Sequence, residues 1–465
     1  RHSSVQQDIP GACGCTKIIG VLVGVPVGIS VGRLVGRSAG HWNLNLRGEL
    51  MKIPEVLAPA GNMEKAKTAI AYGADAIYLS GQLYGMRAQA GNFDNEELVD
   101  VVRYARERNV KVYVTVNIIP HNQHLNGLPE YIAFLKDIGV DAIIVSDVGV
   151  ISIAKRSAPE LPLHLSTQAN TVNWEAARFW SDFGIARIVL AREVTREEIQ
   201  QIRSKVDTEL ELFVHGAMCM AYSGRCLLSA VMTGREANMG ACTQSCRWKY
   251  TVMETKRPGE YFPIEETKEG TYIFNSKDLC LLEYLPEVIA TGVDSLKIEG
   301  RMKSAYYVGT VVRAYRKALD DYAANPGGYQ LDPELLSEVN KVSHRPYYPG
   351  FFFGERAGTY PASSAYVQSY DFVGTVESYD TQAGEAVVGV RNYFPAGSHV
   401  EIIQPRDKLL EVDAVEIIHD EDGVSLEAAH ANYRVRIKTP PVKPMSMLRI
   451  ARADVDGTVL QRESR

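Results

Sequence analysis

Several patterns are missing from this sequence of 465 residues, and each absence excludes a class of protein. The Gly- and Val-rich stretch at 18–32 has only fifteen residues, fewer than the roughly 20 that a membrane-spanning helix requires. There is no His-Glu-x-x-His pattern of a zinc protease and no Gly-x-Ser-x-Gly turn of a serine hydrolase. The net charge of −6 excludes a generally basic surface. We therefore expect no membrane contact, and a nucleic acid would have to bind at a local basic patch.

The composition favours a globular protein with a large core, because 46% of the residues are hydrophobic and 23% are charged. Residues 1–50 differ in character from the rest of the chain. At Met51 the sequence changes to a strand and turn, and from there the pattern stays regular. We expect residues 1–50, with Cys13 and Cys15, to be a non-native or unstructured extension and Met51 to be the true start.

Residues 51–305 repeat one unit, which is a short apolar strand, a turn and an amphipathic helix. Eight such units in about 250 residues are typical of a closed (β/α)8 TIM-like barrel of the α/β class. An open doubly wound sheet is the alternative, but no Gly-x-Gly-x-x-Gly follows the first strand. The cysteine-rich segment 216–280 is an insertion before the last strand. The expected strands are 56–59, 76–79, 112–116, 142–145, 163–166, 187–190, 210–214 and 295–298, with helices at 63–72, 95–109, 128–138 and 174–183.

The remaining chain divides into two parts. Residues 306–366 are expected to form a helical and aromatic connector, with helices at 305–322 and 331–342. From 367 to 455 the hydrophobic period changes to two, which predicts a small antiparallel β-barrel domain. Its expected strands are 373–376, 386–390, 399–403, 414–418, 433–437 and 447–450.

Five of the seven cysteines lie between Cys219 and Cys280, at offsets of seven, sixteen, four and thirty-four residues. Thiolates suit iron–sulfur clusters, but none of these offsets is the Cys-x-x-Cys of a zinc ribbon. From spacing alone, a metal centre and a set of ordinary buried cysteines are about equally supported. We expect a bacterial, cytoplasmic enzyme, in which structural disulfides are rare.

A longer motif connects these cysteines to a known family. It resembles, position for position, the signature of the collagenase-like peptidase family U32. The motif is Glu211-x-Phe213-x-x-Gly216-Ala217-Met218-Cys219-x-x-x-x-Gly224-x-Cys226-x-Leu228-Ser229, and further similar segments are 57–61, 72–76, 275–280 and 297–301. The resemblance covers roughly residues 51–450. The segments Ser343-His-Arg345 and Gly350-Phe-Phe-Phe-Gly354 are similar to one branch, the tRNA hydroxylation proteins.

The resemblance implies a cofactor and two binding partners. Some members of the family carry a [4Fe-4S] cluster, and their ligand pattern falls on Cys219, Cys226, Cys242 and Cys280 of this sequence. Cys246 is then left over, although spacing alone does not exclude it as a replacement for Cys242. The branch implies tRNA as substrate and prephenate, a small carboxylate metabolite, as co-substrate.

Polar residues that follow barrel strands point toward the active-site face of such a fold. Arginine at such positions binds carboxylate or phosphate through two parallel hydrogen bonds. The alternatives are that Glu299 and Arg301 form a structural ion pair and that His215 is a core histidine. Our candidates are His215, Glu299 and Arg301 for catalysis, and Arg87, Asn117, Gln168 and Lys303 for substrate binding.

These observations support three functions. The first is a tRNA-modifying enzyme that uses prephenate and an iron–sulfur cluster to convert a wobble uridine into 5-hydroxyuridine. The second is a collagenase-like endopeptidase, with Cys219 near His215 as the local candidate for a thiol nucleophile. The third is a non-catalytic scaffold for tRNA or protein. The oligomeric state does not follow from the sequence.

Overall fold

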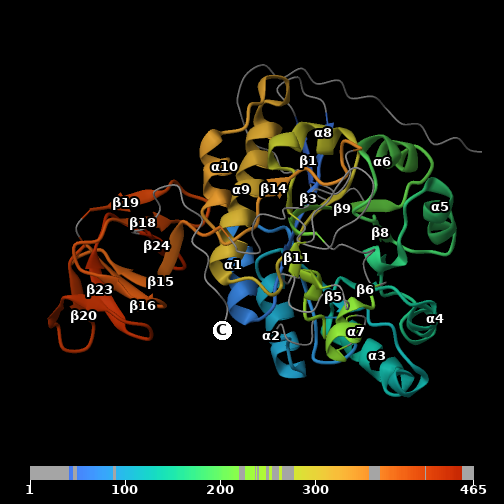
Figure 1. Cartoon of the computed structure of the whole chain (residues 1–465), viewed down its shortest axis with the longest axis horizontal. Helices are drawn as coiled ribbons and strands as arrows, with labels where there is room; N and C mark the ends of the chain where they lie inside the picture. Colours follow the sequence, from blue (N-terminus) through green and yellow to red (C-terminus); the bar gives the residue numbers. More distant parts are fainter. Residues whose placement is uncertain are drawn as a thin grey trace, which may run out of the picture. The chain divides into compact units, whose positions relative to one another are not determined.

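The computed structural model of the protein describes residues 41–44, 50–86, 91–218, 226–235, 237, 240–247, 251–253, 261–263, 277–354, 367–413 and 415–452. Eight parallel strands form a closed barrel, because β13 pairs with β3 on one side and with β9 on the other. The predicted (β/α)8 barrel is therefore confirmed (Figure 1). The strands are β3 (Glu55–Pro59), β4 (Ala76–Leu79), β5 (Lys111–Val116), β6 (Ala142–Val145), β7 (Leu163–Leu165), β8 (Arg187–Val189), β9 (Glu209–Ala217) and β13 (Ser295–Ile298).

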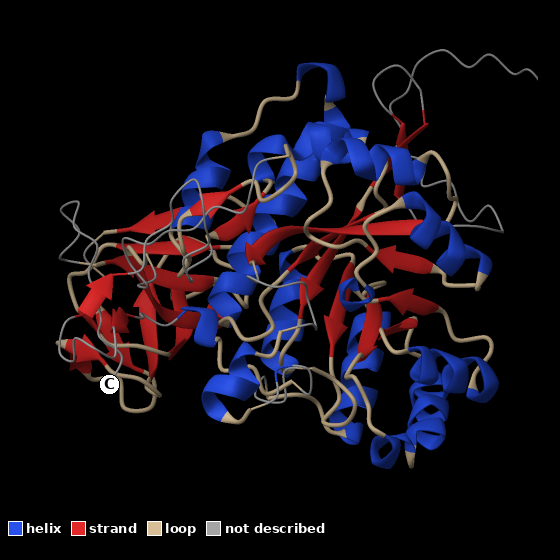
Figure 2. Ribbon diagram, turned by 45° about the vertical axis from the view of Figure 1, so that its right-hand side comes forward, coloured by secondary structure: helices blue, strands red, loops and turns tan. Residues whose placement is uncertain are grey.

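Helices cover the outside of the barrel, and most begin at a side chain that caps the first turn (Figure 2). Asn62 accepts a hydrogen bond from Lys65 N at the start of α1, and Asp94 and Glu97 form a reciprocal capping box at the start of α2. These helices are α1 (Met63–Tyr72), α2 (Asn95–Arg106), α3 (Leu128–Ile138), α4 (Val148–Ser157), α5 (Trp174–Asp182), α6 (Arg196–Arg203), α8 (Leu285–Ala290) and α9 (Ala305–Ala324).

The interior of the barrel is partly charged. Alternate residues of a strand share a face, so Leu57, Ala76 and Tyr113 line the inside, while Val56 and Ala58 pack in the cluster that includes the helices. Toward the N-terminal ends of the strands, Arg187 of β8 binds Glu55 of β3 at 2.7 Å and Glu211 of β9 at 3.2 Å. Lys297 of β13 binds Glu211 at 2.7 Å. A buried ion-pair network thus joins the strands in the half of the barrel at their N-terminal ends.

Two short strands extend the barrel sheet beyond β9. The antiparallel strand β12 (Asp278–Cys280) pairs with the last three residues of β9, and β14 (Tyr347–Tyr348) pairs with β12 in parallel. The sequence predicts neither strand. Because β14 belongs to the connector, a segment about 50 residues past β13 returns to the rim of the barrel.

The insertion between β9 and β12 contains α7 (Leu228–Thr233) and the antiparallel pair β10 (Thr251–Met253) and β11 (Tyr261–Pro263). The sequence of segment 249–273 predicts a hairpin with its turn at Pro258-Gly259, and this pair forms part of it. The turn itself lies outside the described residues.

Where the sequence predicts a small antiparallel β-barrel, the C-terminal part is an antiparallel sheet domain. Its eight-stranded sheet has the order β19-β18-β24-β15-β16-β23-β20-β21, and β17 pairs separately with β22. All six expected strands overlap strands of this domain. Their bounds are β15 (Tyr370–Asp380), β16 (Glu385–Val390), β17 (Phe394–Pro395), β18 (Val400–Ile403), β19 (Leu410–Val412), β20 (Ile417–His419), β21 (Ser425–Leu426), β22 (Ala428–Ala429), β23 (Arg434–Lys438) and β24 (Met447–Ala451).

Helix α10 (Pro333–Asn340) connects the two folded parts. Arg449 of β24, fully buried, donates to Glu338 of α10 and to Glu401 of β18, and Tyr72 of α1 donates to the carbonyl oxygen of Ile403 at 2.8 Å. At the other end of the chain, β1 (His41–Leu44) pairs with β2 (Leu50–Ile53). The expected start at Met51 and the domain boundaries stay predictions. None of the helices in the described ranges combines the length and apolar character that a membrane span needs.

Candidate active site

Arg301 lies at the C-terminal rim of the barrel, just after β13, and only 3% of its surface is exposed. Its Nη1 donates to Thr115 Oγ1 of β5 at 3.1 Å, and its Nη2 donates to the carbonyl oxygen of Met86. These contacts hold the guanidinium across the mouth from its own strand. Such a fixed planar cation suits a carboxylate or phosphate group. The other arginine proposed for this role, Arg87, lies outside the described residues.

Glu299 also lies at this rim, and its surroundings differ from those of Arg301. The Tyr78 hydroxyl donates to Glu299 Oε2 at 3.2 Å, and the Tyr307 hydroxyl donates to the Glu299 carbonyl oxygen at 3.0 Å. Burial and the Glu299 carboxylate together raise the pKa of Tyr78 well above its usual value, so this phenol stays protonated and keeps donating. The carboxylate of Glu299 therefore has a fixed place at the mouth.

Asn117 and Gln168, which are both expected to bind substrate, contact each other at the mouth. Asn117 Nδ2 donates to Gln168 Oε1 at 2.6 Å, and Gln168 Nε2 donates to the Asn117 carbonyl oxygen at 2.9 Å. Met86 N donates to Asn117 Oδ1 at 3.1 Å. The same loop residue thus contacts both Arg301 and Asn117, which links the ends of β5, β7 and β13.

His215 is the most deeply buried of the candidates. Its ring is fully buried among Tyr307, Tyr315 and Tyr347, and its Nε2 lies 3.1 Å from the Tyr347 hydroxyl. Because that hydroxyl donates to the Val339 carbonyl oxygen at 3.1 Å, His215 Nε2–H is the donor to Tyr347. Burial lowers the pKa of His215 to about 3, so the ring is neutral at physiological pH. A catalytic role for His215 stays a prediction.

The connector contributes residues to the mouth that sequence reasoning missed as site residues. Lys303 Nζ donates to the Ser343 carbonyl oxygen at 2.9 Å, and the backbone N–H of buried Arg345 donates to Asp278 Oδ2 at 3.1 Å. Tyr348 lies close enough to Arg192 and Glu193, after β8, for their charges to act on its hydroxyl. The similarity of 343–345 and 350–354 to one branch of a family was the available signal for this segment.

The described cysteines lie in two environments. Cys226, Cys242 and Cys246 are partly buried in the insertion, where Ser229 of α7 accepts a hydrogen bond from Thr243 N at 3.1 Å. This bond holds the segment after Cys242 against the helix that follows Cys226. Cys280 is buried in β12, and burial raises the pKa of its thiol to about 12.

These environments bear on the expected iron–sulfur cluster. Cys219, the first of the four expected ligands, lies outside the described residues. Among the cysteines that are described, no three lie close enough together to share a metal ion. Because Cys219 lies outside the described residues, the ligand set Cys219, Cys226, Cys242 and Cys280 stays a prediction, and we derive no step through the cluster.

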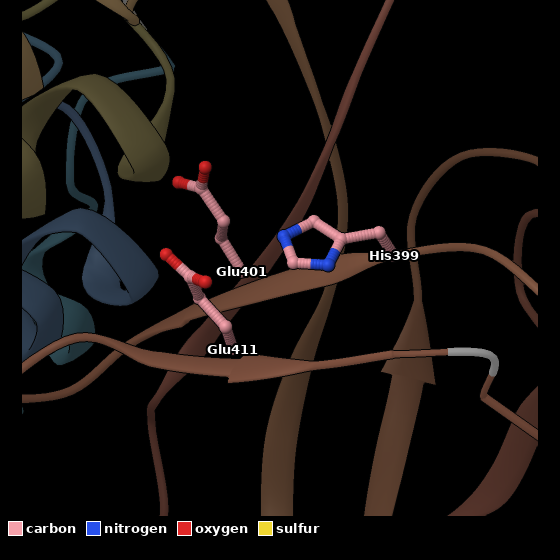
Figure 3. Close-up of side chains that lie close together, drawn as sticks. All are labelled: His399, Glu401 and Glu411. Carbon is pink, nitrogen blue, oxygen red and sulfur yellow. The ribbon is translucent and has the colours of Figure 1, made fainter.

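A different group of side chains in the C-terminal domain does converge. Figure 3 shows the ring of His399 and the carboxylates of Glu401 and Glu411, whose ligand atoms all lie within 4.8 Å of one another. Glu401, however, accepts from Arg449 at 2.8 Å and from Lys341 at 2.9 Å. Two cations already neutralise this carboxylate, which disfavours a metal ion there. We therefore assign this group a structural role.

Comparison of the chain with known proteins finds similar sequences in one family. A model described as peptidase family U32 matches residues 61–360, and one described as its C-terminal domain matches residues 368–449. The tRNA hydroxylation protein P1 of Bacillus subtilis (strain 168) is 42% identical over 410 residues, which cover 87% of this chain and 97% of that protein. The tRNA hydroxylation protein P of Escherichia coli (strain K12) is 38% identical, covering 77% and 87%. An uncharacterized protease of Methanocaldococcus jannaschii is 42% identical over 310 residues, covering 65% and 74%.

Proposed function

Since the chain belongs to peptidase family U32 and matches most of the length of two relatives named for tRNA hydroxylation, we propose that it is an enzyme that hydroxylates a uridine of tRNA. The observation that carries this proposal is the 97% coverage of the Bacillus subtilis protein, which extends through both the barrel and the C-terminal domain. The polar rim at the C-terminal ends of the barrel strands, where enzymes of this fold carry out chemistry, supports it.

The rim residues suit the expected reaction. Replacing the C5–H of uridine by C5–OH is a two-electron oxidation, so an oxidant has to accept two electrons and a co-substrate or water has to supply the oxygen atom. Prephenate is the co-substrate that the family resemblance implies. We assign Arg301, fixed by Thr115 and Met86, to one carboxylate of this metabolite. Lys303 lies on the same loop and adds a second positive charge.

Four more of the site residues predicted from the sequence have roles in this proposal, assigned from their contacts. Asn117 and Gln168 form a mutually hydrogen-bonded pair whose amides position a polar substrate. Glu299 lies two residues before Arg301, and its carboxylate accepts a hydrogen bond from the Tyr78 hydroxyl. The neutral ring of His215 supports Tyr347 in the wall of the mouth. A [4Fe-4S] cluster on the insertion would supply redox chemistry, and its ligands remain those expected from the resemblance.

The alternative is an endopeptidase, which the family name implies. A thiol protease needs a cysteine paired with a histidine that can accept its proton. His215 is buried and its Nε2 is engaged with Tyr347, so its Nδ1 would have to accept this proton. The candidate nucleophile, Cys219, lies outside the described residues. The endopeptidase is therefore the second candidate, and the experiment below separates the two.

Nucleoside analysis tests the proposal directly. We expect a deletion strain to lose 5-hydroxyuridine from its tRNA, measured by mass spectrometry of digested tRNA, and the wild-type gene to restore it. An Arg301→Met variant should fail to restore it, whereas a variant of an exposed residue far from the mouth, Arg178→Met, should restore it fully. Unchanged hydroxyuridine in the deletion strain, together with gelatin cleavage by the purified protein, would instead establish the endopeptidase.

A further inference from the structure

Several buried polar atoms near the C-terminal ends of the barrel strands lack a hydrogen-bond partner within the described part of the chain. Among them are Asn170 Oδ1 and Thr171 Oγ1, in the loop after β7, His215 Nδ1, on β9, and the Tyr348 hydroxyl, on β14. Buried polar atoms are normally paired, since an unpaired one costs stability. An orphaned acceptor and an orphaned donor on the face where substrates bind therefore indicate groups that a ligand satisfies.

Asn170 Oδ1 and the Tyr348 hydroxyl belong to one sector of the mouth. Thr171, the neighbour of Asn170, accepts a hydrogen bond from Ala191 N at 3.2 Å, which joins the loop after β7 to the loop after β8. The residues that follow Ala191 are Arg192 and Glu193, and their charges act on the Tyr348 hydroxyl. Tyr348 pairs with Leu279 of β12, which pairs with Gly216 at the end of β9, the neighbour of β8, so Asn170 and Tyr348 both lie on the β7–β9 side of the rim. Arg301 is held by Thr115 and Met86, and Met86 N donates to Asn117, whose side chain bonds Gln168, two residues before Asn170.

The chemistry of each atom restricts the ligand. Asn170 Nδ2 donates to the Gln168 carbonyl oxygen at 3.1 Å, which orients the amide and leaves Oδ1 as an acceptor. The ligand must therefore bring a donor. Burial raises the pKa of Tyr348 to about 12, so its hydroxyl is protonated and can donate. A carboxylate has no proton to donate to Asn170 Oδ1, so it would leave this acceptor unpaired.

The edge of a uracil base has the required pattern, because its N3–H donor lies between two carbonyl oxygens. We propose that Asn170 and Tyr348 bind the base of the target uridine, with Asn170 Oδ1 accepting from N3–H and the Tyr348 hydroxyl donating to the adjacent carbonyl oxygen. This inference rests on the proposed function and names the residues that select its base. It separates the mouth into a base-binding sector and an anion-binding sector at Arg301.

The chain offers a matched control for Tyr348. The Tyr329 hydroxyl is also buried without a partner in the described ranges, and burial raises the pKa of Tyr329 to about 12 as well. Its ring packs on Tyr322 of α9, at 5.4 Å between centroids, on the outer layer of the barrel. Tyr348→Phe and Tyr329→Phe therefore remove the same atom from similarly buried sites, and only the first should affect the substrate.

The test uses the full-length protein and two synthetic tRNA anticodon stem-loops with a fluorescent label. One carries uridine at the target position, and the other carries 3-methyluridine, which lacks the N3–H donor. We expect the wild type to bind the methylated RNA about tenfold more weakly, as for a neutral hydrogen bond lost from a buried site. Asn170→Ala should bind both RNAs with the weaker affinity, because its acceptor is gone. Tyr348→Phe should weaken binding of both, and Tyr329→Phe should match the wild type.

Equal affinity of the wild type for the two RNAs, or an Asn170→Ala variant that still discriminates between them, would overturn the assignment of this sector. Failure of the proposed function gives a different result. In that case the wild type binds neither RNA and the deletion strain keeps its hydroxyuridine, so the two failures are distinguishable.

Discussion

The buried ion-pair network inside the barrel makes a quantitative prediction. Arg187 is 2% exposed and binds Glu55, Glu209 and Glu211, with Nη1–Oε1 of Glu55 at 2.7 Å. Replacing it with methionine keeps the approximate volume but leaves Glu55 with one cationic partner, Lys111 at 3.4 Å, beside the hydrogen bonds from Tyr113 and Ser295. Removing one partner of a buried ion pair typically costs about 3–5 kcal/mol. We expect Arg187→Met to lower the free energy of unfolding by this amount at pH 7.

The pKa of Glu55 gives an independent magnitude. Burial alone would raise it, but Arg187 and Lys111 outweigh burial and lower the pKa from 4.5 to about 2. A shift of that size corresponds to about 3 kcal/mol of stabilisation at neutral pH. Because the folded-state pKa is the lower one, this contribution is present above about pH 4.5 and is lost as the pH falls toward 2. In the variant, protonation of Glu55 relieves a buried charge, so the difference from the wild type should narrow between pH 7 and 4.

Urea unfolding of the full-length protein, followed by circular dichroism and tryptophan fluorescence, measures both effects. Arg178→Met is the control, because Arg178 and Glu175 form an ion pair with side chains 51% and 55% exposed. Exposed pairs contribute at most about 1 kcal/mol, so this variant should unfold almost like the wild type. If Arg187→Met is no less stable than Arg178→Met at pH 7, the network does not stabilise the barrel and our reasoning is wrong.

Three further predictions concern the mouth and the insertion. Gly216→Ala should lower the thermal unfolding midpoint and abolish hydroxyuridine formation. Gly216 has φ +108°, and an added Cβ would lie 2.5 Å from the Glu299 carbonyl oxygen. An active variant with an unchanged unfolding midpoint would contradict this. Arg301→Lys keeps the charge but loses the forked donors, so we expect at least a tenfold loss of kcat/KM with an unchanged circular dichroism spectrum. After anaerobic purification, Cys242→Ala should lack iron and acid-labile sulfide while Cys246→Ala retains both, and the reverse result would exchange their assignments.

The barrel could be predicted because its signals are local. Each strand is an apolar run bounded by turn residues, and all eight expected strands overlap the observed ones. Helix bounds were predicted well where caps are strong, as at α1, which lies between Asn62 and Gly73. The helix expected at 95–109 ends at Arg106 instead. The chain turns there through Asn109, which has φ +56°, and Val110 N donates back to the Ala105 carbonyl oxygen.

The composition of the mouth depends on contacts that no local pattern encodes. Strands β12 and β14 have three and two residues, too few to show a period, and they form because β9 extends far enough to pair with β12. Tyr348 reaches the mouth only through this pairing. The positions of the cysteine thiols have the same cause, since their spacing along the chain says nothing about how the insertion folds.

The extension of the sheet also explains how the C-terminal domain bears on the mouth. Glu338 and Val339 are neighbours on α10, but they face different partners. Glu338 holds Arg449 of β24, whereas the Val339 carbonyl oxygen accepts from Tyr347, which in turn contacts His215. One turn of α10 thus makes two contacts. Its Glu338 side chain forms a buried ion pair with the C-terminal domain, and its Val339 carbonyl oxygen accepts a hydrogen bond from Tyr347 at the barrel mouth. Loss of the domain would leave the Glu338 charge buried without Arg449, so the helix that supports Tyr347 requires that domain for its own stability.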